Sequence, residues 1–283
     1  MLNFFANMFG VILNFFYENF QNYGIAIIVF SVCIKLILFP ISIRQQKTMK
    51  KSAKVQAKMK ELQEKYSNNP EKLNQEAMEL YKSEKVSPLS GCFSSIIQII
   101  LLLSVFYLVR SPLTFMRKVD SEVINEYKTQ IEQERSNTAY PEISIIQKYG
   151  NEDERVHINM DLLGIDLSSI PSSNLANVKA LIIPVLYVIT TAISMMLTSK
   201  MQANMLKDKE KKEETEADGE EKKDEMDAVL QANKSMNWLM PIMSVSIATV
   251  APLGLALYWL TNNILMIIER LILNKFFNNV EED

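Results

Sequence analysis

The feature that most constrains this chain is the separation of apolar and charged residues along its length. Apolar runs of about twenty residues, the length a helix needs to cross the hydrocarbon core of a bilayer, alternate with segments dense in Lys and Glu. The net charge of the 283 residues is only −3, because the two signs cancel between the charged segments. The pattern predicts an all-α, multi-pass membrane protein.

Five membrane-spanning helices are predicted from the apolar runs. They cover residues 23–43, 89–110, 178–199, 237–251 and 252–274. The last two come from a single apolar region that Pro252 and Gly254 interrupt, and these residue types favour a turn. The fourth span is therefore short: its apolar arm, residues 238–250, is about 20 Å long at 1.5 Å per residue, so it should thin the bilayer locally or tilt into its neighbours.

Residues 1–22 predict an amphipathic helix. Its polar residues, Asn3, Asn7, Asn14 and Glu18, fall within an arc of about 60° when each residue advances the helix by about 100°. Aromatic and aliphatic residues fill the remainder of the circumference. A helix lying in the membrane interface fits this pattern, and the alternative is an ordinary beginning of the first span.

Basic residues cluster directly after the first span. Residues 44–58 contain Arg44, Lys47, Lys50, Lys51, Lys54 and Lys58. Because cytoplasmic loops are enriched in Lys and Arg, we place this segment in the cytoplasm. The spans are then expected to lie in the plasma membrane. Five spans then put the N-terminus outside and the C-terminus inside. The connecting parts are a cytoplasmic segment 44–88, an extracellular segment 111–177, a charged cytoplasmic loop 200–236 and a cytoplasmic tail 275–283.

The cytoplasmic segment 44–88 is predicted to form a helical hairpin. Its turn lies at residues 67–71, where Asn69 can cap a helix and Pro70 suits the first helical position. Narrow apolar seams run along both arms, through Met59, Leu62 and Tyr66 on one and Leu73, Ala77 and Leu80 on the other. A basic face is formed by Arg44, Lys47, Lys51, Lys54 and Lys58. It is either a solvated topological anchor or a contact surface for anionic headgroups, nascent chains or ribosomal RNA.

Lys35 lies in the middle of the first span. A charge at the centre of a span costs about 2.5–3.5 kcal/mol on insertion scales, and such residues usually face a bundle interior or a water-filled cavity. The only acidic residue in any span is Glu269, close to the cytoplasmic end, so we expect Lys35 to lack a carboxylate partner. On that basis, removing Lys35 should relieve a cost rather than destabilise the protein.

Polar residues in the other spans would solvate Lys35 in a hydrophilic groove. We place six residues in this groove beside Lys35: Gln98, Thr191, Ser194, Tyr258, Trp259 and Asn262. Further candidates are Thr190, Thr261 and Asn263. Each of them alone is better explained by a hydrogen bond between packed helices. The set together with Lys35 indicates a wet site within the membrane.

Four stretches carry a resemblance to a known family. They are "IKLILFPISIRQQKTMKKSAKVQAKMKELQEKY", "LYKSEKVSPLSGCFSSIIQIILLLSVFYLV", "LLGIDLS" at 162–168 and "MPIMSVSIATVAPLGLALYWLTNNILMIIE". In order and spacing they resemble the YidC/Oxa/Alb membrane-protein insertases over residues 22–277. The chain resembles the short form of Gram-positive bacteria, which lacks the large periplasmic domain of Gram-negative members.

The resemblance implies an insertase or chaperone for nascent membrane proteins, with an aqueous groove open to the cytoplasm and to lipid. Lys35 matches a conserved Arg of the family's first core span, so the charge is kept while the planar five-donor group is lost. Gln98 matches a Gln of the second span, and Trp259 matches an aromatic position that lines the groove. The resemblance also implies three further partners: the ribosome, the Sec translocon and the lipid bilayer. DNA is not expected to be a partner.

No cofactor, metal site or catalytic residue is predicted, and the chain is not expected to be an enzyme. It contains no Gly-rich phosphate loop and no metal-ligand spacing, and its single His, His157, lies in the extracellular segment. Two alternatives stay open beside insertion: a folding or assembly scaffold without insertase activity, and a small transporter. The scaffold would work without Lys35, and the transporter would conduct ions across vesicles.

The predicted topology can be tested by labelling single cysteines. Cysteines placed at Ser67 and Ser172 should react with a membrane-impermeant reagent from opposite sides, because an odd number of spans separates them. Labelling of both from one side would contradict the five-span arrangement.

Overall fold

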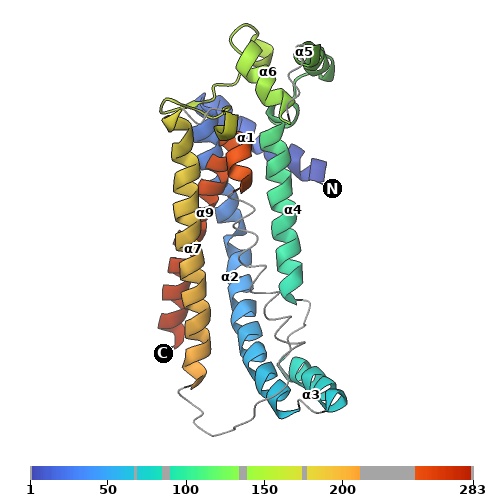
Figure 1. The fold of residues 1–283 in the computed structure, drawn as a ribbon, viewed down its shortest axis with the longest axis vertical. Coiled ribbons are helices and arrows are strands. Elements are labelled where there is room, and N and C mark those ends of the chain that lie inside the picture. The colour runs from blue at the N-terminus through green and yellow to red at the C-terminus, as the bar shows by residue number, and fades with distance from the viewer. Residues whose placement is uncertain are drawn as a thin grey trace. The chain divides into compact units, whose positions relative to one another are not determined.

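The computed structural model describes residues 2–66, 69–84, 90–133, 139–173, 177–210 and 246–281 (Figure 1). Its longer helices are α1 (Leu2–Phe20), α2 (Tyr23–Lys65), α3 (Pro70–Ser83), α4 (Ser90–Arg110), α5 (Ser121–Gln133), α6 (Pro141–Tyr149), α7 (Val178–Glu210) and α9 (Leu253–Glu281). Short helical turns are η1 (Leu113–Arg117), η2 (Glu154–Val156) and η3 (Pro171–Ser173). The protein is mostly helical, as predicted, although β1 (Asp161–Leu162) pairs with β2 (Ile165–Asp166) in a small antiparallel ribbon.

Three of the described helices are long and apolar enough to cross a membrane. The qualifying stretches are Tyr23–Thr48, Val178–Lys200 and Leu253–Lys275, and α4 contributes a shorter apolar stretch, Ile99–Arg110. The predicted fourth span, 237–251, lies mostly outside the described residues, which include a helical piece at 246–250. The predicted break at Pro252 is confirmed, because this helical piece ends at residue 250 and α9 begins at Leu253.

The long helices continue well past the apolar runs that define the predicted spans. α2 does not end at residue 43 but runs through Pro40 and on to Lys65, since neither Gly nor Pro occurs between residues 41 and 65 to interrupt it. α7 likewise continues into the charged loop, to Glu210, and α9 into the tail, to Glu281. One helix therefore carries Lys35 and the basic residues that follow it.

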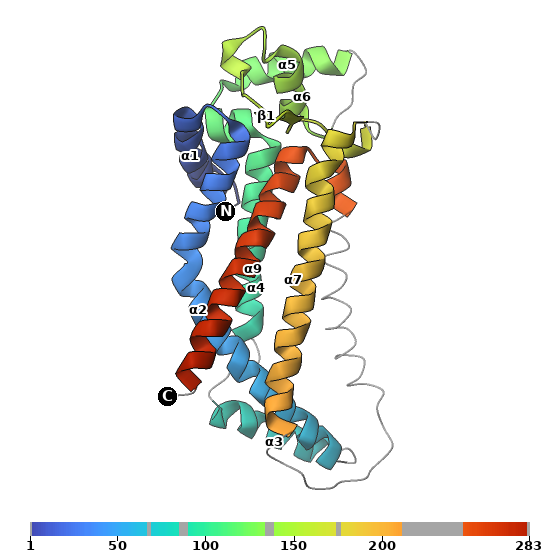
Figure 2. The same ribbon diagram turned by 90° about the vertical axis from the view of Figure 1, so that its left-hand side faces the viewer.

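The chain divides into two compact units. Unit 1 consists of Met1–Ile37, Gln98–Ala192 and Pro241–Glu269, and unit 2 of Leu38–Ile97, Ile193–Met240 and Arg270–Asp283. Unit 1 holds the main hydrophobic core, with Tyr23, Phe30, Leu108, Leu167 and Leu255 among its fully buried side chains. Within this unit, α5 and α6 lie beyond the end of α4, as both views show (Figures 1 and 2).

In unit 2, α2 and α3 form a helical hairpin with few apolar contacts. The side chain of Asn69 accepts a hydrogen bond from the Lys72 amide and Pro70 opens α3, which confirms the predicted cap. All six seam residues are only half-buried, and α3 has no buried residue. The seams are therefore as narrow as the sequence indicates.

Two helices of unit 1 begin against the same loop, residues 159–169. The first amides of a helix have no acceptor within the helix, so they need partners elsewhere. The Tyr23 amide, at the start of α2, donates to the Asn159 carbonyl at 3.0 Å. The Leu253 amide, at the start of α9, donates to the Ser169 carbonyl at 2.9 Å, and the next amide donates to the loop at 2.8 Å. The loop thus sets a common starting level for α2 and α9.

α1 is a separate helix and not the beginning of the first span, so that alternative is wrong. The chain turns at Gln21, whose φ of 50° lies in the left-handed region. Asn159 fixes this turn, because its amide donates to the Tyr17 hydroxyl and its side-chain nitrogen donates to the Gln21 carbonyl, both at 2.9 Å. In Figure 1, α1 runs transverse to the long helices of unit 1. Its location in the membrane interface stays a prediction.

The buried face of α1 packs on η1. Gly10 allows the close approach, since a Cβ at this position would lie 1.9 Å from the Phe115 carbonyl oxygen. Beside this face, the predicted polar arc meets two basic residues: Lys118 donates to Asn7, and the Arg117 guanidinium lies 3.4 Å from Asn14 Oδ1. These contacts fix how α1 is rotated about its own axis.

The opposite side of α1 carries an apolar stripe that no described residue covers. It consists of Phe4, Met8, Val11 and Phe15, all of which are exposed. Their spacing of three and four residues places them on one face of the helix. An exposed aromatic and aliphatic stripe of this kind is what an interfacial helix presents to lipid.

Gly10→Ala should detach or distort α1, because the added methyl group would overlap a backbone carbonyl that cannot move aside freely. We expect a cost of about 1–3 kcal/mol, which is typical of overpacking at a rigid contact. The melting temperature of the purified protein in detergent measures it, with Val11→Ala on the exposed stripe as the control. Equal melting of Gly10→Ala and Val11→Ala would contradict the close α1–η1 contact.

Candidate functional site

Lys35 turns its ammonium group toward the interior of unit 1. Its side chain is 22% exposed, while the next two residues of α2, Leu36 and Ile37, are 68% and 62% exposed. A lipid-facing helix is expected to direct its apolar side chains outward in this way and its charged side chain inward. The sequence-based expectation that Lys35 avoids lipid therefore agrees with its position.

The expectation that Lys35 lacks a carboxylate partner is wrong. Its Nζ lies 2.6 Å from Oε2 of Glu269 on α9, and the Glu269 side chain is only 9% exposed. Both residues belong to unit 1. The candidate site is therefore an ion pair between two apolar helices rather than a lone ammonium group surrounded by neutral polar residues.

The common starting level of α2 and α9 explains the pairing. Lys35 follows Tyr23 by twelve residues and Glu269 follows Leu253 by sixteen, so they lie about 18 Å and about 24 Å along their helices at 1.5 Å per residue. A difference of about 6 Å is within reach of a lysine with its flexible four-carbon stem. A sequence signal for this pairing exists: the depth of each charged residue, counted in residues from the start of its own span. Counted in this way, Lys35 and Glu269 lie at similar depths, whereas the distance of Glu269 from the nearer end of its span does not show this.

Glu269 is only half-satisfied by this contact. Its second oxygen, Oε1, is buried and has no hydrogen-bond partner among the described residues. A carboxylate can accept several hydrogen bonds, and an unfilled buried acceptor is costly in a low-dielectric surrounding. The site therefore contains a filled ionic contact and, next to it, an open acceptor.

Two of the predicted groove residues take part in packing α7 against α9 in unit 1. Thr191 is buried, and its hydroxyl oxygen accepts a hydrogen bond from the Asn263 side chain at 2.7 Å. Trp259 is also buried, with its ring 5.8 Å from that of Tyr187. The Thr191–Asn263 hydrogen bond is of the kind that joins neighbouring helices in a membrane, and the Trp259–Tyr187 contact adds aromatic packing between the same helices.

The other predicted groove residues fall in different places. Tyr258 is half-buried and packs against the core of unit 1, and Asn262 is half-buried on the same helix. Ser194 belongs to unit 2, where its carbonyl and hydroxyl oxygens accept hydrogen bonds from Arg270 at 3.1 and 3.2 Å. The side chain of Gln98 lies outside the described residues. Among the described residues of the predicted groove set, Lys35 is the one that forms an ion pair with Glu269.

The predicted basic face lies on the part of α2 that belongs to unit 2. Arg44, Lys47 and Lys51 are exposed, the Lys54 side chain lies outside the described residues, and Lys58 pairs with Glu84 at the end of α3. Three charges of the face are thus directed to solvent. The remaining described one, on Lys58, helps to hold the two helices of the hairpin together.

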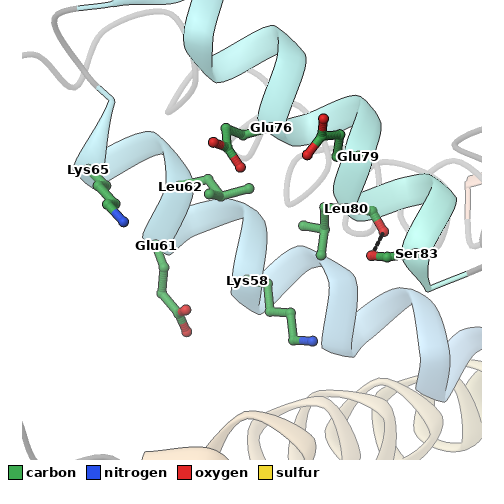
Figure 3. Close-up of a pocket in the computed structure, with 8 residues that line it drawn as sticks. All are labelled: Lys58, Glu61, Leu62, Lys65, Glu76, Glu79, Leu80 and Ser83. Carbon is green, nitrogen blue, oxygen red and sulfur yellow. Dashed lines mark hydrogen bonds between the residues drawn. The ribbon is translucent and has the colours of Figure 1, made fainter.

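A cleft of about 460 Å³ lies between the two arms of this hairpin (Figure 3). Its lining consists of Lys58, Glu61, Leu62, Lys65, Glu76, Glu79, Leu80 and Ser83. Leu62 and Leu80 point toward each other from the two helices, and charged side chains surround them. The mixture of both signs over a small apolar floor is typical of a solvated helix pair with a thin core.

A separate ionic cluster holds the segment between α4 and α7 in shape. The Asp153 carboxylate accepts hydrogen bonds from Arg155 and from the Tyr127 hydroxyl. These contacts, with that from Arg155 the stronger, hold the pKa of the Asp153 carboxyl well below its usual range. His157 is exposed, and its Nδ1 lies 2.7 Å from the Gly150 carbonyl oxygen. Within the described ranges, no three His, Cys, Asp or Glu residues gather as metal ligands would.

The fold and this site together define a helical membrane protein with a charge pair embedded between apolar helices. The chain belongs to the family described as 60Kd inner membrane protein, whose sequence model matches residues 15–281. Family membership confirms the resemblance drawn from the four sequence stretches.

Individual relatives are similar over different lengths, and each is described as a membrane protein insertase YidC. The protein from Chlorobaculum tepidum is 28% identical over 271 residues, which is 96% of this chain and 36% of the relative. The one from Caldanaerobacter subterraneus is 40% identical over 106 residues, 38% of this chain and 52% of the relative. That from Chlorobium limicola is 47% identical over 93 residues. This chain thus spans about a third of the Chlorobaculum relative's length.

The Lys35–Glu269 contact reverses the direction of the stability change that we expect when Lys35 is replaced. Lys35→Met should destabilise the protein by about 3 kcal/mol, because it leaves the Glu269 carboxylate buried without its cation. Lys35→Met combined with Glu269→Leu should recover most of the loss, since both charges are then removed. Melting temperatures in detergent give the order, with exposed Lys179→Met as the control. A single Lys35→Met variant as stable as the double variant would contradict the ion pair.

Proposed function

We propose that this chain is a membrane protein insertase. It moves short hydrophilic segments of nascent membrane proteins across the cytoplasmic membrane through a positively charged groove and then releases the attached transmembrane helix into lipid. The observation that carries the proposal is the inward-facing ammonium group of Lys35, between apolar helices of a chain in the 60Kd inner membrane protein family. The names of its relatives support the same activity.

The chemistry required of such a protein is physical and makes no bond. A hydrophilic segment meets its highest free energy in the hydrocarbon core, and polar groups inside the membrane shorten that path. Lys35 would attract carboxylates of the incoming segment by Coulomb forces, which are stronger in a partly desolvated site than in water. Once the segment has crossed, burial of the substrate's apolar helix in lipid, at about 0.8 kcal/mol per methylene, makes the step favourable.

We infer five spans around the groove, with the N-terminus outside and the C-terminus in the cytoplasm. The groove would be lined by Lys35, Gln98, Tyr258 and Asn262, together with those faces of Thr191, Ser194 and Trp259 that helix packing leaves accessible. The short fourth span, 237–251, would thin the bilayer beside it and so lower the barrier further. This arrangement rests on the apolar runs and on the basic residues after the first span.

The hairpin of α2 and α3 would lie in the cytoplasm and receive substrates. The exposed Arg44, Lys47 and Lys51 suit anionic partners such as lipid headgroups or ribosomal RNA, and the ribosome and the Sec translocon are the assemblies that would deliver nascent chains. Its thin core and half-buried seams favour local opening, as is common in segments that receive partners.

Insertion measured in vesicles tests this function. Vesicles containing the purified protein should insert a single-span substrate with an acidic external tail, and Lys35→Arg should keep this activity because the positive charge remains. Lys35→Gln should reduce insertion of the acidic-tailed substrate by roughly tenfold, the change that a lost interaction of about 1.4 kcal/mol produces. A substrate with a neutral tail should be affected much less, and exposed Lys179→Gln serves as the matched control.

Two outcomes would contradict the proposal. Equal insertion by Lys35→Gln and the wild type would show that the mid-span charge has no part in the activity, as a scaffold would predict. Ion flux through the vesicles without insertion would favour the small transporter.

A further inference from the structure

The Lys35–Glu269 pair changes what an incoming segment meets at the proposed site. In the described structure, the ammonium group is already bound to a carboxylate at 2.6 Å. A neutral ion pair attracts a distant carboxylate much less than a lone cation does, because the two fields largely cancel. The attraction on which the proposed function relies is therefore available only to a segment that displaces Glu269 from Lys35.

We propose that Glu269 is a specificity-determining residue that competes with substrate carboxylates for Lys35. The inference rests on the proposed insertase function. Glu269 belongs to the same compact unit as Lys35, and its carboxylate lies 2.6 Å from the ammonium group. A substrate tail with a single acidic residue meets this competitor. A tail with several acidic residues presents more carboxylates to the same cation and competes better.

The environment of Glu269 supports a displaceable contact rather than a fixed one. A carboxylate held only for structure would be expected to have both oxygens satisfied, but Oε1 of Glu269 is buried without a partner among the described residues. By contrast, Glu142, a buried carboxylate in the same unit, uses both oxygens: they accept hydrogen bonds from the Thr114 amide at 3.0 Å and the Thr114 hydroxyl at 2.7 Å. Among the described residues, the polar contact that Glu269 makes is therefore the one to Lys35, the cation that a substrate would bind.

The open Oε1 also provides a place for a substrate donor. When a substrate carboxylate takes Lys35, the freed Glu269 can accept hydrogen bonds from backbone amides or hydroxyl groups of the same segment through both of its oxygens. The residue would then help to solvate a segment within the membrane instead of opposing it. The preferred substrate is therefore a hydrophilic segment that carries more than one acidic residue.

The test compares insertion of a series of single-span substrates whose tails carry zero, one, two or three acidic residues. Vesicles containing the wild type should insert the tails with two or three acids well and the one-acid tail poorly. Glu269→Gln keeps the shape of the side chain but removes the competing charge. It should raise insertion of the one-acid tail by roughly threefold to tenfold, as expected when the competent fraction of a site rises from a minority to a majority.

The neutral tail reports whether the effect is electrostatic. Glu269→Gln should change its insertion far less than insertion of the one-acid tail, whereas a purely structural defect would lower insertion of every tail alike. Exposed Glu126→Gln on α5 is the matched control and should behave as the wild type. The same insertion profile for Glu269→Gln and the wild type across the tail series would overturn the competition.

Two further variants keep the inference separate from the proposed function and from folding. If Lys35→Gln impairs acidic tails while Glu269→Gln has the wild-type profile, insertion by Lys35 stands and competition by Glu269 fails. If Lys35→Gln has no effect, the proposed function itself fails. The charge-exchanged variant, Lys35→Glu with Glu269→Lys, keeps a pair of opposite charges and allows a test even if Glu269→Gln does not fold. It should retain the rule that acidic tails need more than one acidic residue, and insertion that is independent of the number of acids would overturn the inference.

Discussion

The hydrogen bonds that tie the starts of α2 and α9 to the loop at residues 159–169 determine the rest of unit 1. They satisfy amides that the helices cannot satisfy themselves, and they place two separate apolar helices at one level. Everything that follows along these helices is then aligned, because both advance by the same rise per residue. The meeting of Lys35 with Glu269 is a consequence of this alignment, since the two residues are distant in sequence and belong to helices joined only through other elements.

Local signals in the sequence predicted the helices well, because each signal acts within a few residues. The cap formed by Asn69 and Pro70 and the interruption at Pro252 were identified because such residues act on their own backbone. The small ribbon of β1 and β2 was missed, since a pair of two-residue strands carries too few residues to show an alternating pattern. The unbroken path of α2 into the hairpin has no sequence signal of its own, because a change from apolar to charged residues ends a span without ending a helix.

The candidate site was only half-predicted for a different reason. The inward orientation of Lys35 follows from the cost of an ammonium group in lipid, which concerns one residue and its solvent. Its pairing with Glu269 depends on the relative level of two helices, which is set by the loop between other elements and not by either helix. Thr191 and Trp259 show the same limit: their residue types suit either a wet site or helix packing, and the structure describes their packing contacts between α7 and α9. Residue type alone could not distinguish these two uses.

The contacts of α1 have a mechanical consequence for the whole of unit 1. Gly10 packs against the Phe115 carbonyl, and Lys118 and Arg117 contact the polar side of the helix. Together these contacts prevent α1 from rotating about its axis. The stripe of Phe4, Met8, Val11 and Phe15 therefore points in one fixed direction relative to the core. A freely hinged amphipathic helix could follow any surface without affecting the domain to which it is attached. With α1 held in this way, any apolar surface that binds the stripe would also set the tilt of unit 1 relative to that surface.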